Sequence, residues 1–588
     1  MDQPRIDSIL AIDVGSVNTQ AALIARVEGV FRFVARAQLP TTLEEPWSDV
    51  TIGVRHTVEQ LAQIAARPLL TQAGDLITPE QHNGSGVDVC VLTCSAAQPL
   101  RLVLAGLVGE LSVDSLRRAA SGTYTWVEDV IALLGAQRLS DEARARRIMT
   151  LQPDLVCVAG GTDGGAETQV LDLVEAVMLG ASLMPAPTRP KIVYAGNAAL
   201  RTKVHDLVGS QTELIVAEAN VRPTLETEDL GPLQAELEMI HAKTKIARVP
   251  GLATCAEWSK YPILSTARSI GHVVQYLSTT GDGTRGTLCV DAGASATTVA
   301  AAFNGQLYLT VRSDIGTAFG GTRLLKEIDA ALISRWLPFE LTSGELESFV
   351  INKELRPASI PQDTHDLLIE QALAREALRA TLRMARPNWS AANLRSKTDN
   401  LPSMEPIIGS GAVLTRAPRP GQAALMLLDA LEPVGITMLL LDVYGMMPAL
   451  GAAAIAQPMC AVQAIDNGGL FPLGTVVAPI GHARPGEVIL GVKMSYESGG
   501  DLEVEVAAGT LEVLPLSQGQ KATLRLQPRN RTIDIGRGPG RAASKVNVNG
   551  GTVGLIIDAR GRPLASSLSI DPAKRRERMQ QWLWDTGA

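Results

Sequence analysis

The sequence predicts an α/β protein whose two lobes face a common ligand cleft, and three glycine-bearing turns are the reason. In residues 11–20, and again in residues 290–299, a β-prone segment ends at an Asp, a bend containing glycine follows, and a second β-prone segment leaves. A third turn, in residues 407–413, carries an apolar run into a Gly-Ser-Gly bend. Because the first two turns are of one kind and lie far apart in the chain, we expect one in each lobe.

The first lobe is expected over residues 1–110. Strand-like segments surround the first turn, a helix is predicted around residues 54–66, and two further strands are predicted near residues 87–93 and 102–107. This order of elements is similar to that of a ribonuclease-H-like lobe.

An inserted α/β domain is expected over residues 111–255, where helical and strand patterns alternate. Such alternation builds a parallel sheet, and ligands of such sheets bind beyond the carboxyl ends of the strands. The glycine-rich run 160–165 is predicted to lie at such an end. Two interpretations of this run stay open. It either faces a partner, a ligand or the cleft between the lobes, or it is a plain turn in which Asp163 caps a helix that begins at Ala166.

The second lobe is expected over residues 256–457, and it includes an amphipathic helix over residues 366–383. Beyond it, short strands separated by glycine-rich turns predict a separate β-rich domain with a terminal helix over residues 458–588. Within that domain, residues 534–541 resemble an anion-binding loop, but the surrounding hairpin pattern favours a plain connection. The basic run in the terminal helix, residues 572–584, is typical of a solvated face.

Composition indicates a large folded protein. The chain has 588 residues, more than one hydrophobic core usually organises, and 46% of them are hydrophobic. A formal net charge of −8 argues against a surface built on bulk positive charge, so no nucleic-acid partner is expected. No signal peptide or membrane-spanning run is predicted, so we expect a cytoplasmic protein without membrane contact. The six cysteines are interpreted as buried thiols; a metal pair at Cys90 and Cys94 is disfavoured because no further ligands stand at suitable spacing.

The turns supply the chemistry of a nucleotide site. A carboxylate at the mouth of such a hairpin can hold the water shell of a divalent ion, so Asp13 and Asp291 are the candidate metal-binding and catalytic residues. Glycine in the bend lets backbone N–H groups approach a phosphate that a Cβ would obstruct. One such turn is more often an ordinary hairpin, whereas two with a matching third favour a nucleotide clamp. The candidate nucleotide-binding residues are Gly15, Ser16, Thr19, Gly293, Ala294, Thr297, Thr298, Gly409, Ser410 and Gly411.

The order of these parts resembles that of the actin, Hsp70 and sugar-kinase superfamily of two-lobed ATPases. Three segments are more specific: residues 153–165, which contain the run Gly-Gly-Thr-Asp-Gly-Gly, residues 193–197, and residues 314–317. Together they resemble the glutamate mutase L-type proteins, over about residues 8–456. The resemblance implies an actin-like ATPase fold with two ribonuclease-H-like lobes, and ATP and Mg²⁺ as cofactors. It also implies a chaperone or reactivating role toward an adenosylcobalamin-dependent mutase.

Three positions depart from the pattern of that family. Val299 stands where relatives carry an acid, Gln20 where a Lys often follows the Thr, and Ala412 where the adenosine turn has a further glycine. These changes predict that nucleotide binding is more secure than hydrolysis, with a slow ATPase activity at most. Two other functions stay open: a nucleotide-binding scaffold or filament-forming protein, and a small-molecule kinase, for which the sequence indicates no general base. Oligomer formation is also left open.

Overall fold

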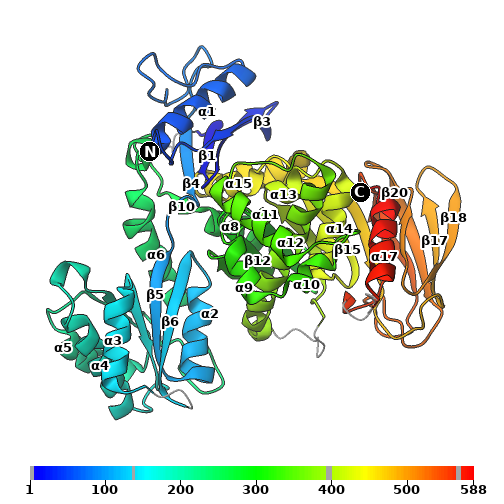
Figure 1. Ribbon diagram of the computed structural model, residues 1–588. Helices are drawn as coiled ribbons and strands as arrows, with labels where there is room; N and C mark the ends of the chain where they lie inside the picture. The colour runs from blue at the N-terminus through cyan, green and yellow to red at the C-terminus, as the bar shows by residue number, and fades with distance from the viewer. Residues whose placement is uncertain (1–4, 136–138, 282, 393–399, 565–570) are drawn as a thin grey trace. The chain divides into compact units, whose positions relative to one another are not determined.

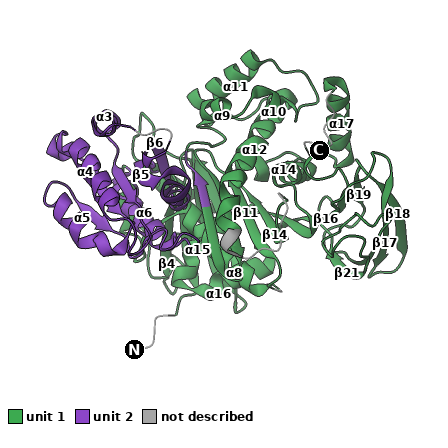
Figure 2. Ribbon diagram, turned by 90° about the horizontal axis from the view of Figure 1, so that it is seen from below, with its two compact units in different colours: residues 1–96, 250–309, 314–588 green, residues 97–249, 310–313 purple. Residues whose placement is uncertain are grey.

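The protein is described from a computed structural model, which describes residues 5–135, 139–281, 283–392, 400–564 and 571–588. Figure 1 labels the helices and strands, and Figure 2 colours the two compact units that the chain forms. Each unit is described by itself. Unit 1 comprises Met1–Ala96, Pro250–Leu309 and Asp314–Ala588, and unit 2 comprises Ala97–Val249 and Thr310–Ser313. In the described parts of the chain, no helix combines the length and apolar character that crossing a membrane requires.

Unit 1 contains a five-stranded sheet built around the first Asp-glycine turn, in the order β10-β4-β1-β2-β3. β1 pairs antiparallel with β2, and β2 pairs antiparallel with β3, whereas β1, β4 and β10 run parallel. The core strand β1 is buried along nearly all of its length, since α1 and later helices cover the sheet. The elements are β1 (Ser8–Val14), β2 (Asn18–Val27), β3 (Val30–Pro40), α1 (Val50–Ile64), β4 (Val89–Cys94) and β10 (Leu264–Ser265).

A second sheet in unit 1 repeats this arrangement around the second Asp-glycine turn. Its first five strands lie in the order β13-β12-β11-β14-β15. If the five strands of each sheet are numbered along the chain, both sheets have the spatial order 3-2-1-4-5. β11 and β12 are antiparallel, and β11, β14 and β15 are parallel. The strands are β11 (Gly286–Ala292), β12 (Thr297–Phe303), β13 (Gln306–Arg312), β14 (Met404–Ser410) and β15 (Gly435–Leu441). This duplication confirms the predicted fold class, an α/β two-lobed protein with ribonuclease-H-like lobes.

Helices of the second half of unit 1 cover both sheets. α12 and α14 pack together against the core of the second sheet, whereas α15 lies against β1 and β4 of the first sheet. The chain therefore returns to the first lobe after β15. The helices are α7 (Leu252–Ala256), α8 (Thr266–Thr280), α9 (Gly321–Glu327), α10 (Ala330–Ser334), α11 (Ser343–Leu355), α12 (Thr364–Ala385), α13 (Ala412–Thr415), α14 (Pro420–Leu431), α15 (Met446–Ala456) and α16 (Pro458–Ala464).

The residues beyond 458, predicted as a separate β-rich domain, are divided between two sheets. β16, β22 and β19 extend the second sheet beyond β15, so that this sheet has eight strands, and only β18, β17, β20 and β21 form a sheet of their own. Local strand patterns do not reveal which neighbours a strand will find, and this is why the continuation was not foreseen. The elements are β16 (Phe471–Ala478), β17 (Val488–Tyr496), β18 (Asp501–Ala507), β19 (Leu511–Leu514), β20 (Lys521–Pro528), β21 (Ala543–Asn549), β22 (Leu555–Asp558) and α17 (Pro572–Asp585).

Unit 2 is built on a parallel sheet in the order β6-β5-β7-β8-β9. Numbered within the unit this is 2-1-3-4-5, an order found in doubly wound folds. The parallel sheet was predicted, but the strand near residues 102–107 was assigned to the first lobe and instead forms β5 of this sheet. The elements are β5 (Leu100–Val108), α2 (Asp114–Ala120), β6 (Thr125–Leu134), α3 (Asp141–Leu151), β7 (Leu155–Ala159), α4 (Thr168–Ser182), β8 (Lys191–Tyr194), α5 (Arg201–Val208), β9 (Leu214–Val216) and α6 (Gly231–Thr244).

Candidate functional site

The ends of four strands of unit 1 meet at one cavity of about 130 Å³. Asp13 and Asp291 are the second-last residues of β1 and β11, Ser410 ends β14, and Asp442 follows β15 directly. Because the two sheets repeat each other, equivalent strand ends from both lobes face the same space. The residues lining it are Asp13, Gly15, Ser16, Val17, Asn18, Gln20, Arg36, Gln38, Ser95, Thr266, Asp291, Gly293, Ala294, Ser410, Gly411, Ala412, Thr415, Arg416, Asp442, Val443, Gly445 and Pro448.

Asp13 is held in place by two threonine hydroxyls. Thr93 on β4 donates to Asp13 Oδ1 at 2.6 Å, and Thr266 at the start of α8 donates to the same oxygen at 2.7 Å. Burial raises the pKa of Asp13 despite these two hydrogen bonds. Sequence reasoning predicted the acid but not the threonines, which come from distant segments.

Asp291 and Asp442 complete a group of three cleft carboxyls. Burial raises the pKa of Asp291 to about 7, against a hydrogen bond with Ser410, and the charges of Asp13 and Asp442 act in the same direction as burial. Burial also raises the pKa of Asp442 to about 6, although it accepts backbone N–H groups of Met446 at 2.6 Å and Met447 at 2.9 Å. Three acids that repel one another when ionised favour a bound cation at this place.

The spacing of these acids suits a hydrated ion better than direct ligation by all three. Among the residues that the structure describes, the one group of three whose ligand atoms all lie within 4.8 Å is Asp363, His365 and Asp366, far along the chain from the cleft acids. The cleft also offers Gln20 Oε1, a buried oxygen without a hydrogen-bond partner in the described part of the chain. Carboxylates and an unpaired acceptor fit the water shell of Mg²⁺, which gives up its waters reluctantly.

The two Asp-glycine turns have the same tight geometry. A Cβ at Gly15 would lie 2.7 Å from the carbonyl oxygen of Asn18, and a Cβ at Gly293 would lie 2.8 Å from that of Ala296. In both turns the blocking oxygen belongs to the residue three positions on. Each bend therefore favours glycine because a Cβ would clash with the turn itself, whereas the predicted approach of these turns to a phosphate stays a prediction.

The Gly-Ser-Gly turn approaches the second Asp-glycine turn closely. Gly411 has a φ of +92°, and a Cβ there would lie 2.2 Å from the carbonyl oxygen of Ala292. The flat backbone at this point thus borders the cleft, and Ser410, Gly411 and Ala412 all line the cavity.

Four of the predicted binding residues lie outside the cavity lining. Thr19 Oγ1 shares a hydrogen bond of 2.9 Å with Thr41 Oγ1, and Thr297 Oγ1 donates to the carbonyl oxygen of Ile315 at 2.9 Å. Thr298 is buried in β12 opposite Asp291, and Gly409 is packed among leucine side chains inside β14. All four residues are packed inside the sheets and do not line the cavity.

Val299 stands where relatives of the family carry an acid, and the sequence analysis interpreted this as the loss of a carboxylate from the cleft. The structure does not support that interpretation. Val299 pairs with Val290 across β11 and β12, and both are fully buried in the core of the second sheet. An acid there would lie on the core face, so the cleft has not lost a carboxylate at this position. Gln20, in contrast, does face the cleft, and Asp442 adds an acid that the sequence analysis missed. Its signal was available, since Asp442 follows an apolar strand and precedes Gly445 by three residues.

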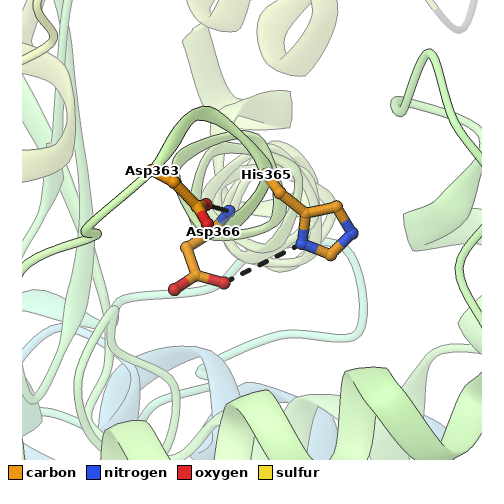
Figure 3. A group of neighbouring side chains, drawn as sticks. All are labelled: Asp363, His365 and Asp366. Atoms are coloured by element: carbon orange, nitrogen blue, oxygen red, sulfur yellow. Dashed lines mark hydrogen bonds and ion pairs between the residues drawn. The ribbon is translucent and has the colours of Figure 1, made fainter.

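Other candidate groups have structural explanations. Asp363, His365 and Asp366, drawn in Figure 3, lie at the start of α12, where Asp363 accepts the backbone N–H of Asp366 at 2.8 Å as a helix cap. In residues 534–541 the carboxylate of Asp534 itself accepts three backbone N–H groups, so that loop is an internally satisfied connection. All six cysteines are buried, as predicted.

The glycine-rich run 160–165 of unit 2 does not form the helix cap that was one of its two interpretations. Asp163 does not cap the following helix, which begins at Thr168 without a side-chain cap. Its carboxylate instead accepts the backbone N–H of Ala198 at 2.9 Å and the amide of Asn220 at 3.0 Å. It therefore joins the loops that follow three neighbouring strands of the sheet.

The duplicated sheets and the paired turns at one cleft define a two-lobed protein with the actin-like ATPase fold. The chain belongs to the MutL protein family, the family of glutamate mutase L, whose sequence model matches residues 9–468. The match covers most of the chain and confirms the resemblance seen in the sequence. A curated relative, Protein MutL of Clostridium tetanomorphum, is 23% identical over 446 residues, which are 71% of this chain and 88% of the relative.

Several solved structures are similar to parts of this one at low scores. Nucleotide-free acetone carboxylase is 11% identical with a TM-score of 0.32, covering 85% of this chain and 81% of that chain. Nucleotide-free diol dehydratase-reactivating factor is 12% identical with a TM-score of 0.28, covering 79% and 100%. Xylulose kinase of Bifidobacterium adolescentis is 10% identical with a TM-score of 0.25, covering 79% and 94%. Likeness at this level does not transfer a function.

Proposed function

We propose that this protein is an ATP-binding, Mg²⁺-dependent reactivating factor or chaperone of an adenosylcobalamin-dependent mutase. Membership of the MutL family supports the mutase as partner, because that family is associated with such enzymes. The observation that carries the nucleotide proposal is the convergence of Asp13 and Asp291, each at the end of a duplicated strand, on a single cavity. Cobalamin would belong to the partner, and the protein would act in the cytoplasm.

In this proposal the residues divide into three roles. Asp13, Asp291 and Asp442 hold the waters of Mg²⁺, with Gln20 Oε1 as a further acceptor. Backbone N–H groups near Gly15, Ser16, Gly293 and Ala294 bind the phosphates. Gly411 and Ala412 lie against the nucleoside. When it is bound, Mg²⁺ supplies neutralisation of the phosphate charge.

Nucleotide binding requires the lobes to move apart. The cavity has about 130 Å³, whereas small-molecule sites usually have roughly 300 to 1,000 Å³. Contacts that both lobes make with a nucleotide exist only when the cleft is shut around it, so binding energy drives closure. Turning a 1:99 equilibrium into 99:1 takes about 5.5 kcal/mol of differential binding. This motion is the proposed means by which nucleotide state alters the grip on the mutase.

Calorimetry with ATP and ADP, with and without Mg²⁺, tests the nucleotide proposal. We expect binding that is at least tenfold tighter with the metal. No heat and no thermal shift at millimolar nucleotide would contradict it, and would favour the nucleotide-independent form of the scaffold or filament alternative. Mass spectrometry of proteins co-purified from the source cell tests the partner. Recovery of an adenosylcobalamin enzyme supports the proposal, and its absence from a preparation that retains other partners opposes it.

Hydrolysis is proposed to be slow, below the ~1 to 100 s⁻¹ typical of kinases. Gln20 brings no positive charge to the phosphates where a Lys often stands, and donors that bind the ground state and the transition state alike do not accelerate a reaction. One observation favours the alternative of a small-molecule kinase or an autonomous ATPase: Asp291 has a pKa raised to about 7, which suits a general base at neutral pH. A steady-state phosphate-release assay on the isolated protein decides, since turnover of several per second would favour this alternative.

A further inference from the structure

Two arginines from different lobes line the cavity, and none of the roles above uses them. Arg36 lies on β3 of the first sheet, and Arg416 follows α13, next to the Gly-Ser-Gly turn of the second. Gln38 Oε1 accepts hydrogen bonds from both guanidinium groups, and its distance to Arg416 Nη2 is 3.0 Å. Arg36 Nη1 also donates to the carbonyl oxygen of Val443, just past the end of β15, at 2.8 Å.

The two guanidinium groups share one acceptor and neither forms a direct ion pair among the described residues, although cleft carboxyls line the same cavity. Burial lowers the pKa of Arg36, the neighbouring charge of Arg416 lowers it further, and Asp442 acts in the opposite direction. Among the ion pairs of the described residues, neither guanidinium has a carboxylate within 4.0 Å, and the oxygen that they share is a neutral amide. Two cations that share only a neutral acceptor, in a cavity that both Asp-glycine turns line, are complementary to an anion that would replace this acceptor.

We propose that Arg36 and Arg416 bind the phosphate chain of the nucleotide in the cleft, and so supply the positive charge that Gln20 does not. This inference rests on the proposed function. A guanidinium presents several N–H donors in a planar fork that matches phosphate oxygens, and such charge-assisted bonds are about twice as strong as neutral ones. Gln38 holds the pair in position until the phosphate replaces it as the common acceptor. Because one arginine comes from each lobe, their shared ligand also holds the lobes together.

Equilibrium binding of adenosine, ADP and ATP, each with Mg²⁺, tests this role in Arg36→Gln and Arg416→Gln. Both variants should raise the dissociation constants of ADP and ATP at least tenfold and change that of adenosine less than twofold. Arg36→Lys keeps the charge without the fork and should recover part of the loss. Arg32→Gln is the matched control, since Arg32 is an exposed arginine on the same strand that does not line the cavity, and it should bind like the wild type.

Each other result overturns the inference. If the arginines only latch the lobes shut, their removal will tighten the binding of all three ligands. If they stack on the base, adenosine will weaken as much as ATP does. Equal affinities of the wild type and the variants for ADP and ATP also reject a phosphate role. If Arg36→Gln does not fold, Arg416→Gln still tests the inference, because Arg416 is exposed. A wild type that binds neither ADP nor ATP contradicts the proposed function, whereas a wild type that binds both with unaffected variants contradicts this inference alone.

Discussion

At the residue scale, the cleft carboxyls oppose folding when they are ionised. Burial is the main cause of the raised pKa values of Asp13, Asp291 and Asp442. A carboxyl whose pKa is higher in the folded than in the unfolded chain binds more protons when folded, so the free energy of unfolding falls as pH rises across that interval. For Asp291 the interval runs from 3.8 to about 7. The site therefore costs stability at neutral pH, and a bound cation reduces the cost.

Asp291→Asn should consequently stabilise the ligand-free protein at pH 8 and have a smaller effect at pH 5, where the wild-type carboxyl is largely protonated in the folded chain. One pKa unit corresponds to about 1.4 kcal/mol, so an interval of about three units gives a gain on the order of 4 kcal/mol at pH 8 and about 2 kcal/mol at pH 5. Thermal unfolding of wild type and variant without Mg²⁺ at both pH values measures it. A loss of stability that is the same at pH 5 and pH 8 would mean that the hydrogen bond with Ser410 outweighs the charge.

The same substitution should weaken Mg²⁺-nucleotide binding, as should Asp13→Asn. If both acids hold the waters of one ion, the loss in the double variant will be smaller than the sum of the two single losses, because removal of either acid already disrupts the shared ion. Calorimetric titration of the wild type, the two single variants and the double variant with Mg²⁺-ADP measures the loss of binding free energy in each variant. Strictly additive losses, or loss of the fold in either single variant, would argue against a shared metal site.

The sequence predicted those residues of the candidate site that lie inside the turns and line the cavity. Asp13 and Asp291 were recognisable because the acid, the glycine and the flanking strands are contiguous. Arg36 was not, because it enters the cleft through strand register: β3 pairs with β2 so that Gln38 lies opposite Gln20, and Arg36 is two residues away on the same face. Arg416 comes from the opposite lobe. A single sequence contains no local signal that Arg36 and Arg416 line the same cavity.

At the element scale, the Gly-Ser-Gly turn couples β14 to the second Asp-glycine turn. Gly411 combines a φ of +92° with a close approach of its backbone to the carbonyl oxygen of Ala292. Any side chain there would push the two turns apart. The position of the Gly-Ser-Gly turn, proposed to bind the nucleoside, relative to the second Asp-glycine turn, proposed to bind phosphate, thus depends on the absence of a Cβ at Gly411.

Gly411→Ala should therefore destabilise the protein and weaken nucleotide binding more than tenfold. The backbone conformation of Gly411, with φ +92° and ψ +150°, costs a non-glycine residue about 1 to 3 kcal/mol, and relief of a contact at 2.2 Å requires a backbone shift in addition. Gly29→Ala is the matched control, because its φ is +85° and no atom lies within 4 Å of the added Cβ. Thermal unfolding and ADP titration of both variants should show the control losing stability only. Equal behaviour of the two variants would show that the close approach has no role.

Element types were more predictable than element partners. The helix predicted around residues 54–66 and the amphipathic helix over residues 366–383 correspond to α1 and α12, because hydrophobic periodicity is a local property. The strand near residues 102–107 was recognised but assigned to the wrong sheet. Sheet membership depends on hydrogen-bonding partners far away in the sequence, such as Leu155 opposite Leu102, and a strand pattern does not encode them.

At the scale of the whole molecule, a buried ionic network joins the C-terminal segment to the second lobe. Arg560 Nη1 lies 2.8 Å from Asp429 Oδ1, and Arg375 Nε lies 2.8 Å from Asp429 Oδ2. Asp558 binds Arg560 and Arg562, each at 2.8 Å, and all five side chains are at most 2% exposed. Although burial alone would raise the pKa of Asp558, Arg560 and Arg562 hold it below its usual range.

The network crosses the end of the family match at residue 468, because Arg375 and Asp429 lie before it and the other three residues lie after it. Asp429→Asn should cost about 3 to 5 kcal/mol, since it leaves two buried guanidinium groups without their shared counter-charge. Glu505→Gln removes a partner from the exposed pair with Arg529 and should cost about 1 kcal/mol or less. Thermal unfolding of both variants measures the contrast. If Asp429→Asn costs no more than Glu505→Gln, and a chain ending at residue 468 still unfolds cooperatively, the C-terminal segment is an appendage rather than part of the second lobe's core.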